Sequence, residues 1–299
     1  MTRQAWGRVW LAVAATMGVF TAPAALALDD PAAAPAAPAA PAAPAAPAAP
    51  AAPSARREWD AALGAVLVYG PEFAGADRFT LRLNPGFYLR WGRVSIATRG
   101  GFRSASEPGE RGGMRIDLSP SDRFKLNVGL RYDGGRQESS SEALKGLGDI
   151  PSTLRVRTSG TYLIGEGWSG GATVVFDALG RGGGWQGDVH FGRELRASPD
   201  TTWSFGGALA YAGDRHMQTY FGITEEQSAR TGYPVYTPPA GLRDVSASIN
   251  GRSQLGGDWQ RWHVFYGGSA SRLLGPAAAS PLTRQRNAWS VNAGLAYRF

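Results

Sequence analysis

Residues that could perform catalysis are few and scattered along this sequence of 299 residues. The three histidines, His190, His216 and His263, lack neighbouring ligands at the spacings that metal sites use. Ser269 and His263 fall on one predicted strand, six residues and roughly 20 Å apart, so they cannot form a nucleophile–base pair. We therefore expect a non-enzymatic protein with no catalytic residue, no bound metal and no cofactor.

Two further kinds of site are excluded by local sequence. Residues 165–170 spell Gly-Glu-Gly-Trp-Ser-Gly, which matches the dinucleotide fingerprint G-x-G-x-x-G. That fingerprint needs a following helix, whereas this segment opens a predicted strand, so it indicates a turn. The chain has no Cys, which excludes a disulfide framework and Cys-ligated zinc or iron–sulfur centres.

Ionic side chains are the more abundant chemistry. The net charge is +7, but the basic residues occur singly among aromatics rather than in the clusters typical of nucleic-acid binding. If the apolar strand faces meet lipid, ionic residues line the interior, and His190 points inward beside Asp188. A ladder of ion pairs and an anion-attracting passage are both compatible with this lining. The residues that we assign to the lumen are Arg82, Arg99, Arg123, Lys125, Arg131, Arg155, Arg157, Asp188, Glu194 and Arg252.

The elements that would carry these side chains are β-strands, because the dominant hydrophobic period is two. Apolar and polar residues alternate from Phe124 to Tyr132, and again from Trp289 to Phe299. Such a strand has one apolar and one polar face. The apolar faces are too continuous for a soluble surface, and the polar faces are too charged for a soluble core. A membrane barrel is therefore favoured over a soluble sandwich.

Connection lengths support the barrel, because short and long links alternate along the chain. Short turns on the periplasmic side and longer loops outside are typical of outer-membrane barrels. We predict an antiparallel up-and-down barrel of twelve strands, with ten as the alternative because segment 112–119 is weak. The predicted strands are 58–69, 79–90, 93–103, 112–119, 123–132, 153–164, 168–178, 184–195, 201–212, 242–255, 259–272 and 286–299.

Two segments precede the barrel. Residues 1–27 resemble a secretory signal peptide, with Arg3 and Arg8, a short apolar run and an Ala25-Leu26-Ala27 cleavage pattern. The apolar run is well short of the ~20 residues of a membrane-spanning helix. Residues 28–55 are rich in Pro-Ala-Ala triplets and predict an extended spacer. Residues 56–299 then form the barrel.

The longest link, 213–241, differs from the others. Residues 225–230 predict a short helix that Thr224 caps and that ends before Gly232. Long ordered loops of this kind often fold over or into a barrel mouth. We therefore predict a plug or lid, and contact with a ligand or partner is the alternative. The residues assigned to it are Tyr220, Phe221, Gly222 and Tyr236.

Several short motifs are spread along the barrel segment. They are Tyr69–Asp77, Gly135-Arg136, Leu144–Asp149, Tyr220–Ile223, Gln227–Gly232 with Tyr236, and Ser280-Pro281-Leu282. The Tyr297-Arg298-Phe299 ending also resembles the C-terminal signature of outer-membrane proteins. In order and spacing these motifs resemble the MipA/OmpV family of outer-membrane proteins, named for the MltA-interacting protein. The resemblance covers residues 58–299, and the Pro-Ala-Ala spacer departs from the family pattern.

The resemblance implies a scaffold in the outer membrane of a Gram-negative bacterium. Its partners would be a murein lytic transglycosylase and a bifunctional penicillin-binding protein in peptidoglycan synthesis, besides the outer-membrane lipid. A small-solute or anion channel and a surface adhesin are the alternatives. A scaffold must meet such partners on the periplasmic side, at the short turns. The residues we assign to that contact are Arg93, Asp122, Glu166, Asp200 and Asp258.

Overall fold

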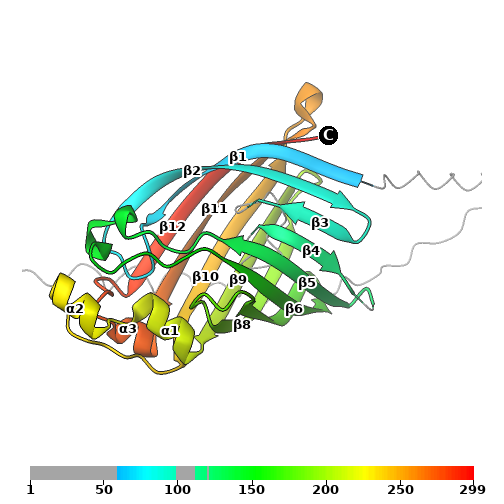
Figure 1. Cartoon of the computed structure of the whole chain (residues 1–299). Coiled ribbons are helices and arrows are strands. Elements are labelled where there is room, and N and C mark those ends of the chain that lie inside the picture. The colour runs from blue at the N-terminus through cyan, green and yellow to red at the C-terminus, as the bar shows by residue number, and fades with distance from the viewer. Residues whose placement is uncertain (1–58, 99–111, 120) are drawn as a thin grey trace, which may run out of the picture. The chain divides into compact units, whose positions relative to one another are not determined.

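The structure is a computed structural model that describes residues 59–98, 112–119 and 121–299. The predicted signal peptide and spacer, and Arg99, lie outside these residues. Twelve antiparallel strands form a closed barrel, in which each strand pairs with its neighbours in sequence and β12 pairs with β1 (Figure 1). The predicted twelve-stranded barrel is confirmed, and the ten-stranded alternative is wrong.

The strands are β1 (Trp59–Pro71), β2 (Phe79–Trp91), β3 (Val94–Ala97), β4 (Gly113–Asp117), β5 (Phe124–Asp133), β6 (Thr153–Gly165), β7 (Trp168–Asp177), β8 (Trp185–Arg196), β9 (Thr201–Ala212), β10 (Gly241–Gln254), β11 (Trp262–Leu273) and β12 (Asn287–Arg298). The helices are α1 (Asp214–Phe221), α2 (Glu225–Thr231) and α3 (Gly275–Ala279), with three 3₁₀ turns, η1 (Glu138–Ser140), η2 (Glu142–Leu144) and η3 (Gly257–Trp259).

The barrel wall follows from the alternation of side chains along each strand. On β5, Phe124 and Leu130 are exposed on the outer face, whereas Asn127 is buried on the inner face. The same alternation continues around the wall, so that large apolar side chains point outward on most strands. An outward apolar surface of this extent is stable against lipid rather than water.

Aromatic side chains form two belts on the outer face. Tyr69, Phe79 and Trp289 contact one another near the long loops, with ring centroids 4.9–5.7 Å apart. Trp262 and Tyr297 contact each other near the short turns, at 5.3 Å. Trp289 and Tyr297 lie eight residues apart on β12, which is about 27 Å along the strand and about 20 Å along the membrane normal at a ~40° tilt. The two belts therefore bracket most of the apolar band of about 25 Å that outer-membrane barrels present to lipid.

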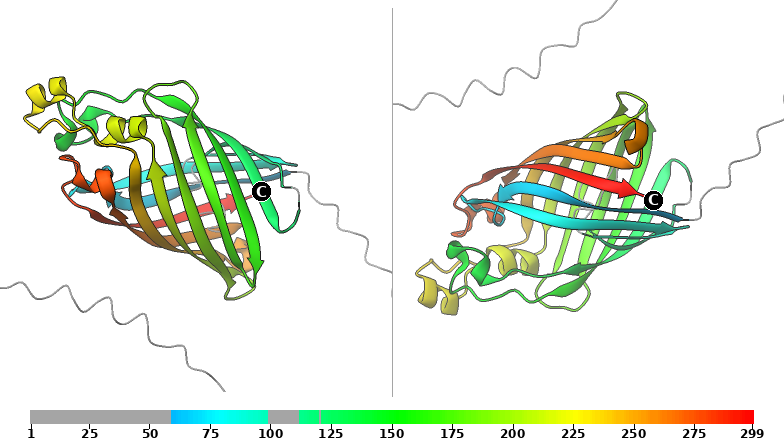
Figure 2. Two further views of the ribbon diagram at one scale, coloured as in Figure 1. Left: turned by 90° about the horizontal axis from the view of Figure 1, so that it is seen from below. Right: turned by 90° about the horizontal axis from the view of Figure 1, so that it is seen from above.

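The two ends of the barrel differ. The first residue of β1, the last residue of β12 and the short turns share one end, and the three α-helices lie at the other (Figures 1 and 2). One of the short turns is Gly165-Glu166-Gly167, whose residues have φ of 130°, 50° and 80°. Glycine adopts such backbone readily, which allows a tight reversal. This segment is the turn that the sequence predicted.

Three local features differ from the predictions. Strands β3 and β4 span four and five residues, whereas the other strands span ten to fourteen. The predicted strand 93–103 thus reaches Ala97 within the described residues, and residues 99–103 lie outside them. Strand β10 contains a bulge between Leu242 and Asp244. Helix α1 was predicted as loop.

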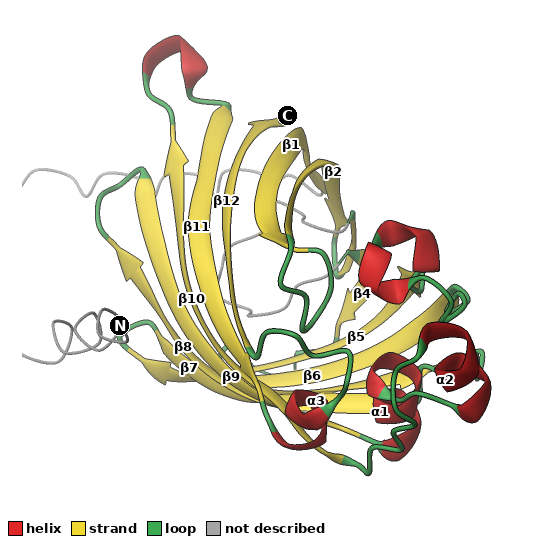
Figure 3. Cartoon of the chain, turned by 90° about the vertical axis from the view of Figure 1, so that its left-hand side faces the viewer, coloured by secondary structure: helices red, strands yellow, loops and turns green. Residues whose placement is uncertain are grey.

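The long loops share a small hydrophobic core, which we call the loop cap. Leu144, Leu147, Ile223 and Leu282 are buried together, with Phe73 packed against them. These side chains come from four different loops. Figure 3, which views the barrel from this end, shows α1, α2 and α3 gathered at one part of the rim.

Among the described residues, no helix is both long and apolar enough to cross a membrane.

Candidate functional site

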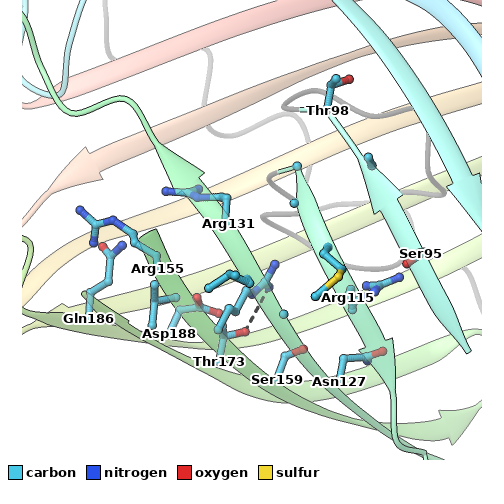
Figure 4. A pocket seen from close by; sticks show the side chains of 18 of the residues that line it. Ser95, Thr98, Arg115, Asn127, Arg131, Arg155, Ser159, Thr173, Gln186 and Asp188 are labelled. Atoms are coloured by element: carbon cyan, nitrogen blue, oxygen red, sulfur yellow. Dashed lines mark hydrogen bonds between the residues drawn. The ribbon is translucent and has the colours of Figure 1, made fainter. Parts of the chain in front are cut away.

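A cavity of about 130 Å³ lies on the inner face of the barrel wall. Residues of β2 to β8 and one residue of β10 line it. Its charged lining consists of Arg115, Arg131, Arg155, Arg157, Arg243 and Asp188. Figure 4 shows Arg131, Arg155 and Gln186 toward one end of this pocket and Arg115 toward the other. We call it the arginine cavity.

Arg155 is the most deeply buried side chain of the cavity, with 1% of its surface exposed. It lies on β6 opposite Arg131 of β5, and both guanidinium groups contact Asp133 Oδ2, at 2.5 Å from Arg155 Nε and 3.0 Å from Arg131 Nη2. Arg155 Nη2 donates to the Tyr220 hydroxyl at 2.9 Å. Its Nη1 is buried and has no hydrogen-bond partner within the part of the chain that the structure describes. One donor of a buried cation is therefore available to a bound molecule.

The other cavity arginines are also held in position. Arg157 Nη2 donates to Thr173 Oγ1 at 3.3 Å, across the β6–β7 pair (Figure 4). Arg243 donates from Nε to Asp244 Oδ2 at 2.6 Å and from Nη1 to Gln186 Oε1. Because these partners fix the guanidinium planes, a ligand would meet an arrangement already formed.

The cavity carries an excess of positive charge. Among the described residues, five arginines and one carboxylate, that of Asp188, line it. Asp133 and Asp244 touch three of the arginines through ion pairs. With these two included, five guanidinium groups face three carboxylates. A basic lining of low dielectric attracts anions and disfavours cations.

The remaining lumen residues predicted from the sequence are spread along the wall. Lys125, Glu194 and Arg252 lie on β5, β8 and β10, near the short-turn end. Arg82 lies toward the loop end and donates to the Pro71 carbonyl at 3.3 Å. Arg123 is exposed at a turn before β5 rather than in the cavity. The structure thus brings Arg131, Arg155, Arg157 and Asp188 together and leaves the others apart.

The histidines occupy separate surroundings. His190 is buried on the inner face, with Nδ1 3.1 Å from Asp188 Oδ2, as predicted. His216 lies in α1, where Nδ1 contacts the Gly183 carbonyl at 3.0 Å and the ring stacks on Tyr220. No group of three or more metal-ligating side chains occurs among the described residues.

The residues of the predicted plug or lid lie in an ordered loop. Helix α1 carries Tyr220 and Phe221, Gly222 ends it, and Ile223 forms an isolated bridge with Tyr236. The Tyr236 hydroxyl donates to the Pro276 carbonyl at 2.8 Å, and burial raises its pKa, so it remains a donor. The predicted helix at 225–230 is present as α2, with a capping box at Thr224 and Gly232 at φ 74°.

Loop 134–152 packs against the loop that contains α1 and α2. Arg136 Nη1 donates to the Tyr220 carbonyl at 3.1 Å, and burial lowers the pKa of Arg136. Gln227 Nε2 donates to the Leu147 carbonyl at 2.7 Å, and Arg230 Nε to the Gly146 carbonyl at 2.9 Å. Several motifs that carried the family resemblance therefore meet in and around the loop cap.

The five turn residues predicted to contact partners lie at the opposite end. All five are exposed and occupy links between consecutive strands: Arg93, Asp122, Glu166, Asp200 and Asp258. Their arrangement suits a broad contact surface rather than a binding cavity.

Two of the five cavity arginines, Arg115 and Arg243, were not predicted from the sequence. Arg115 lies in β4, the strand whose alternation was the weakest. Arg243 occupies the β10 bulge, and both Arg243 and its neighbour Asp244 face inward. Strict alternation would send adjacent side chains to opposite faces, so a bulge hides such a residue from pattern analysis.

The chain is similar to known proteins at two levels, a protein family and several solved structures. The family model described as MltA-interacting protein MipA matches residues 63–299. A comparison with curated proteins finds no match. Similar solved structures include the NanC porin, at 8% identity and a TM-score of 0.39, covering 79% of this chain and 98% of that one. The translocator domain of autotransporter NalP from Neisseria meningitidis has 10% identity and a TM-score of 0.40, covering 81% and 88% of the two chains.

Proposed function

Because the chain belongs to the MltA-interacting protein MipA family, we propose that this outer-membrane barrel is a scaffold for murein enzymes. Its partners would be a murein lytic transglycosylase and a bifunctional penicillin-binding protein. The barrel itself would perform no catalysis. Its role would be to hold the two enzymes beside the outer membrane during peptidoglycan synthesis.

The observation that supports this proposal is a set of exposed short turns. They lie at the end of the barrel where β1 begins and β12 ends. In outer-membrane barrels this end is periplasmic, where murein enzymes act. Four of the five turn residues are acidic, namely Asp122, Glu166, Asp200 and Asp258. Charged side chains around a contact surface steer association and fix orientation.

The test is binding of a purified MltA-type lytic transglycosylase to the barrel in detergent. The variant D122N/D200N/D258N removes three charges from the turns. The matched control, E142Q/E225Q/E226Q, removes three exposed charges at the loop end. We expect the turn variant to weaken binding by about tenfold, since charge-assisted contacts are lost. The control should bind like the unmodified protein.

The opposite result would place the binding surface for the transglycosylase at the loop end of the barrel. If the control loses binding and the turn variant keeps it, the periplasmic turns are not the surface. If a folded barrel binds neither the transglycosylase nor a penicillin-binding protein, the scaffold role is wrong. Heat-dependent migration on a gel provides the check of folding for every variant.

A second candidate function, passage of small anions, is favoured by the arginine cavity. Five guanidinium groups on the inner face raise the local concentration of anions. A scaffold needs no such lining.

A further inference from the structure

We propose that the arginine cavity is a binding site for a small oxyanion, either a carboxylate or a phosphate group. The inference does not depend on the scaffold role. It also differs from passage of anions, because a site can hold an ion whether or not that ion crosses the barrel.

The first argument is the unsatisfied donor on Arg155. The side chain is 1% exposed, and its Nη1 has no hydrogen-bond partner among the described residues. A buried donor without an acceptor costs free energy, and more so when it is charged. An oxyanion supplies an acceptor with opposite charge at this position. Water would supply the acceptor but not the charge.

The second argument is the convergence of guanidinium groups around one space. Arg155 and Arg157 lie two residues apart on β6 and therefore share its inner face. Arg131 lies directly opposite Arg155, and Arg243 reaches the same cavity from β10. A guanidinium group presents paired N–H donors whose geometry matches a carboxylate or phosphate.

The third argument is charge. Two cavity arginines, Arg131 and Arg155, contact the same carboxylate, Asp133. Asp188, the carboxylate in the lining, contacts His190 at 3.1 Å. The excess of arginine over aspartate is relieved when an anion binds. A cation or a neutral solute would not relieve it.

The size of the cavity limits the ligand. A volume of about 130 Å³ accommodates a carboxylate or phosphate group with some water, but not a large solute in full. Neutral polar residues, including Asn127 and Ser159, and apolar residues, including Leu130 and Val175, complete the lining. The site therefore fits the anionic group of a solute, or a small free anion.

The test is saturation-transfer NMR on the full chain in detergent. The probes are acetate, methyl phosphate and acetamide, and acetamide is the neutral isostere of acetate. We expect saturable transfer to acetate or methyl phosphate and none to acetamide. Transfer to acetate alone assigns a carboxylate site, and transfer to methyl phosphate alone assigns a phosphate site.

A matched pair of variants locates the binding. Arg157→Met removes a cavity charge, and Arg123→Met removes one at the exposed turn. We expect about a tenfold loss of anion affinity in R157M, from one lost charge-assisted contact, and no change in R123M. Should R157M fail to fold, R115M removes a charge at the other end of the cavity.

Two outcomes would overturn the proposal. Equal transfer to acetate and acetamide would show that charge is not recognised. An equal effect of R157M and R123M would show that binding reflects overall charge rather than the cavity. Because no voltage is applied, neither outcome depends on conduction or on the murein partners.

Discussion

At the level of single residues, the Tyr220 hydroxyl joins the long loop to the barrel wall. It accepts a hydrogen bond from Arg155 Nη2, while the Tyr220 ring stacks on His216 and its carbonyl accepts from Arg136. One residue of α1 thus contacts Arg155 of the cavity through its hydroxyl and loop 134–152 through its main-chain carbonyl. Its hydroxyl is the part that faces the buried cation.

Tyr220→Phe should destabilise the folded barrel. The substitution keeps the ring and removes the acceptor, so a second donor of Arg155 is left without a partner. We expect a loss of about 1–2 kcal/mol in the free energy of unfolding. Urea unfolding from lipid vesicles measures it.

The control for this prediction is Tyr162→Phe. Tyr162 is 48% exposed on the lipid-facing side of β6, and it lies opposite Phe124. Its hydroxyl contacts no buried cation, so we expect a change within about 0.5 kcal/mol. Equal losses in the two variants would contradict the role that we give to Tyr220.

The alternation in the sequence predicted some of the cavity residues but not all. Arg131, Arg155 and Arg157 lie on regular strands, so their inward direction follows from the period of two. Arg243 could not be assigned, because the bulge at Leu242/Asp244 interrupts that period. The contact of Tyr220 with Arg155 was equally inaccessible, since no periodicity fixes the path of a loop.

At the level of elements, helix α2 docks on the neighbouring loop through its own side chains. Gln227 takes part in the capping box with Thr224 and also donates to the Leu147 carbonyl. Gln227 therefore both stabilises the start of α2 and attaches the helix to loop 134–152. The capping residue Thr224 and the terminating Gly232 allowed this helix to be predicted from the sequence.

Thr224→Ala should loosen α2 without opening the barrel. The substitution removes the side-chain oxygen that accepts a hydrogen bond from the backbone N–H of Gln227, at 3.2 Å. A lost N-cap costs about 1 kcal/mol, which corresponds to about fivefold faster amide exchange. Hydrogen exchange followed by mass spectrometry should show this in α2 and no change in β10.

The matched control is Thr224→Ser, which retains the capping hydroxyl. We expect its exchange to match that of the unmodified protein. If T224S and T224A exchange alike, the cap does not hold the helix. If β10 also exchanges faster in T224A, the loop and the wall are one cooperative unit.

Helix α1 shows where prediction of elements fails. It is a short helix between Gly213 and Gly222, and no side chain caps its start. Met217 and Phe221 are one turn apart and pack with Ala277 of α3. Its stability therefore derives from contacts with a distant loop, which no local pattern reveals.

At the level of the whole molecule, closure of the barrel links residues far apart in the chain. Eight residue pairs join β1 to β12, from Ala62 with Arg298 to Tyr69 with Val291. Arg298 also forms a two-point ion pair with Asp60, at 2.8 and 3.0 Å. The number of strands and the alternation of link lengths predicted this closure well, because both are set by the membrane.

If the barrel passes small ions, it should favour anions. In planar bilayers under a salt gradient, we expect a reversal potential on the anion side. Arg157→Met should reduce the selectivity, because a cavity charge is removed, whereas Arg123→Met at the exposed turn should not. Cation preference, or equal effects of both variants, would exclude the arginine cavity as the selective element.

The loop cap constrains how the cell-surface side of this protein can change over generations. Its core takes side chains from four loops, 72–78, 134–152, 213–240 and 274–286. Replacing any one loop leaves the other three with a gap or a clash. Variation that evades a phage or an antibody must then arise by coupled substitutions, or on exposed helix positions such as Glu225 and Ala229. We therefore expect such a surface to change as a unit rather than by exchange of single loops.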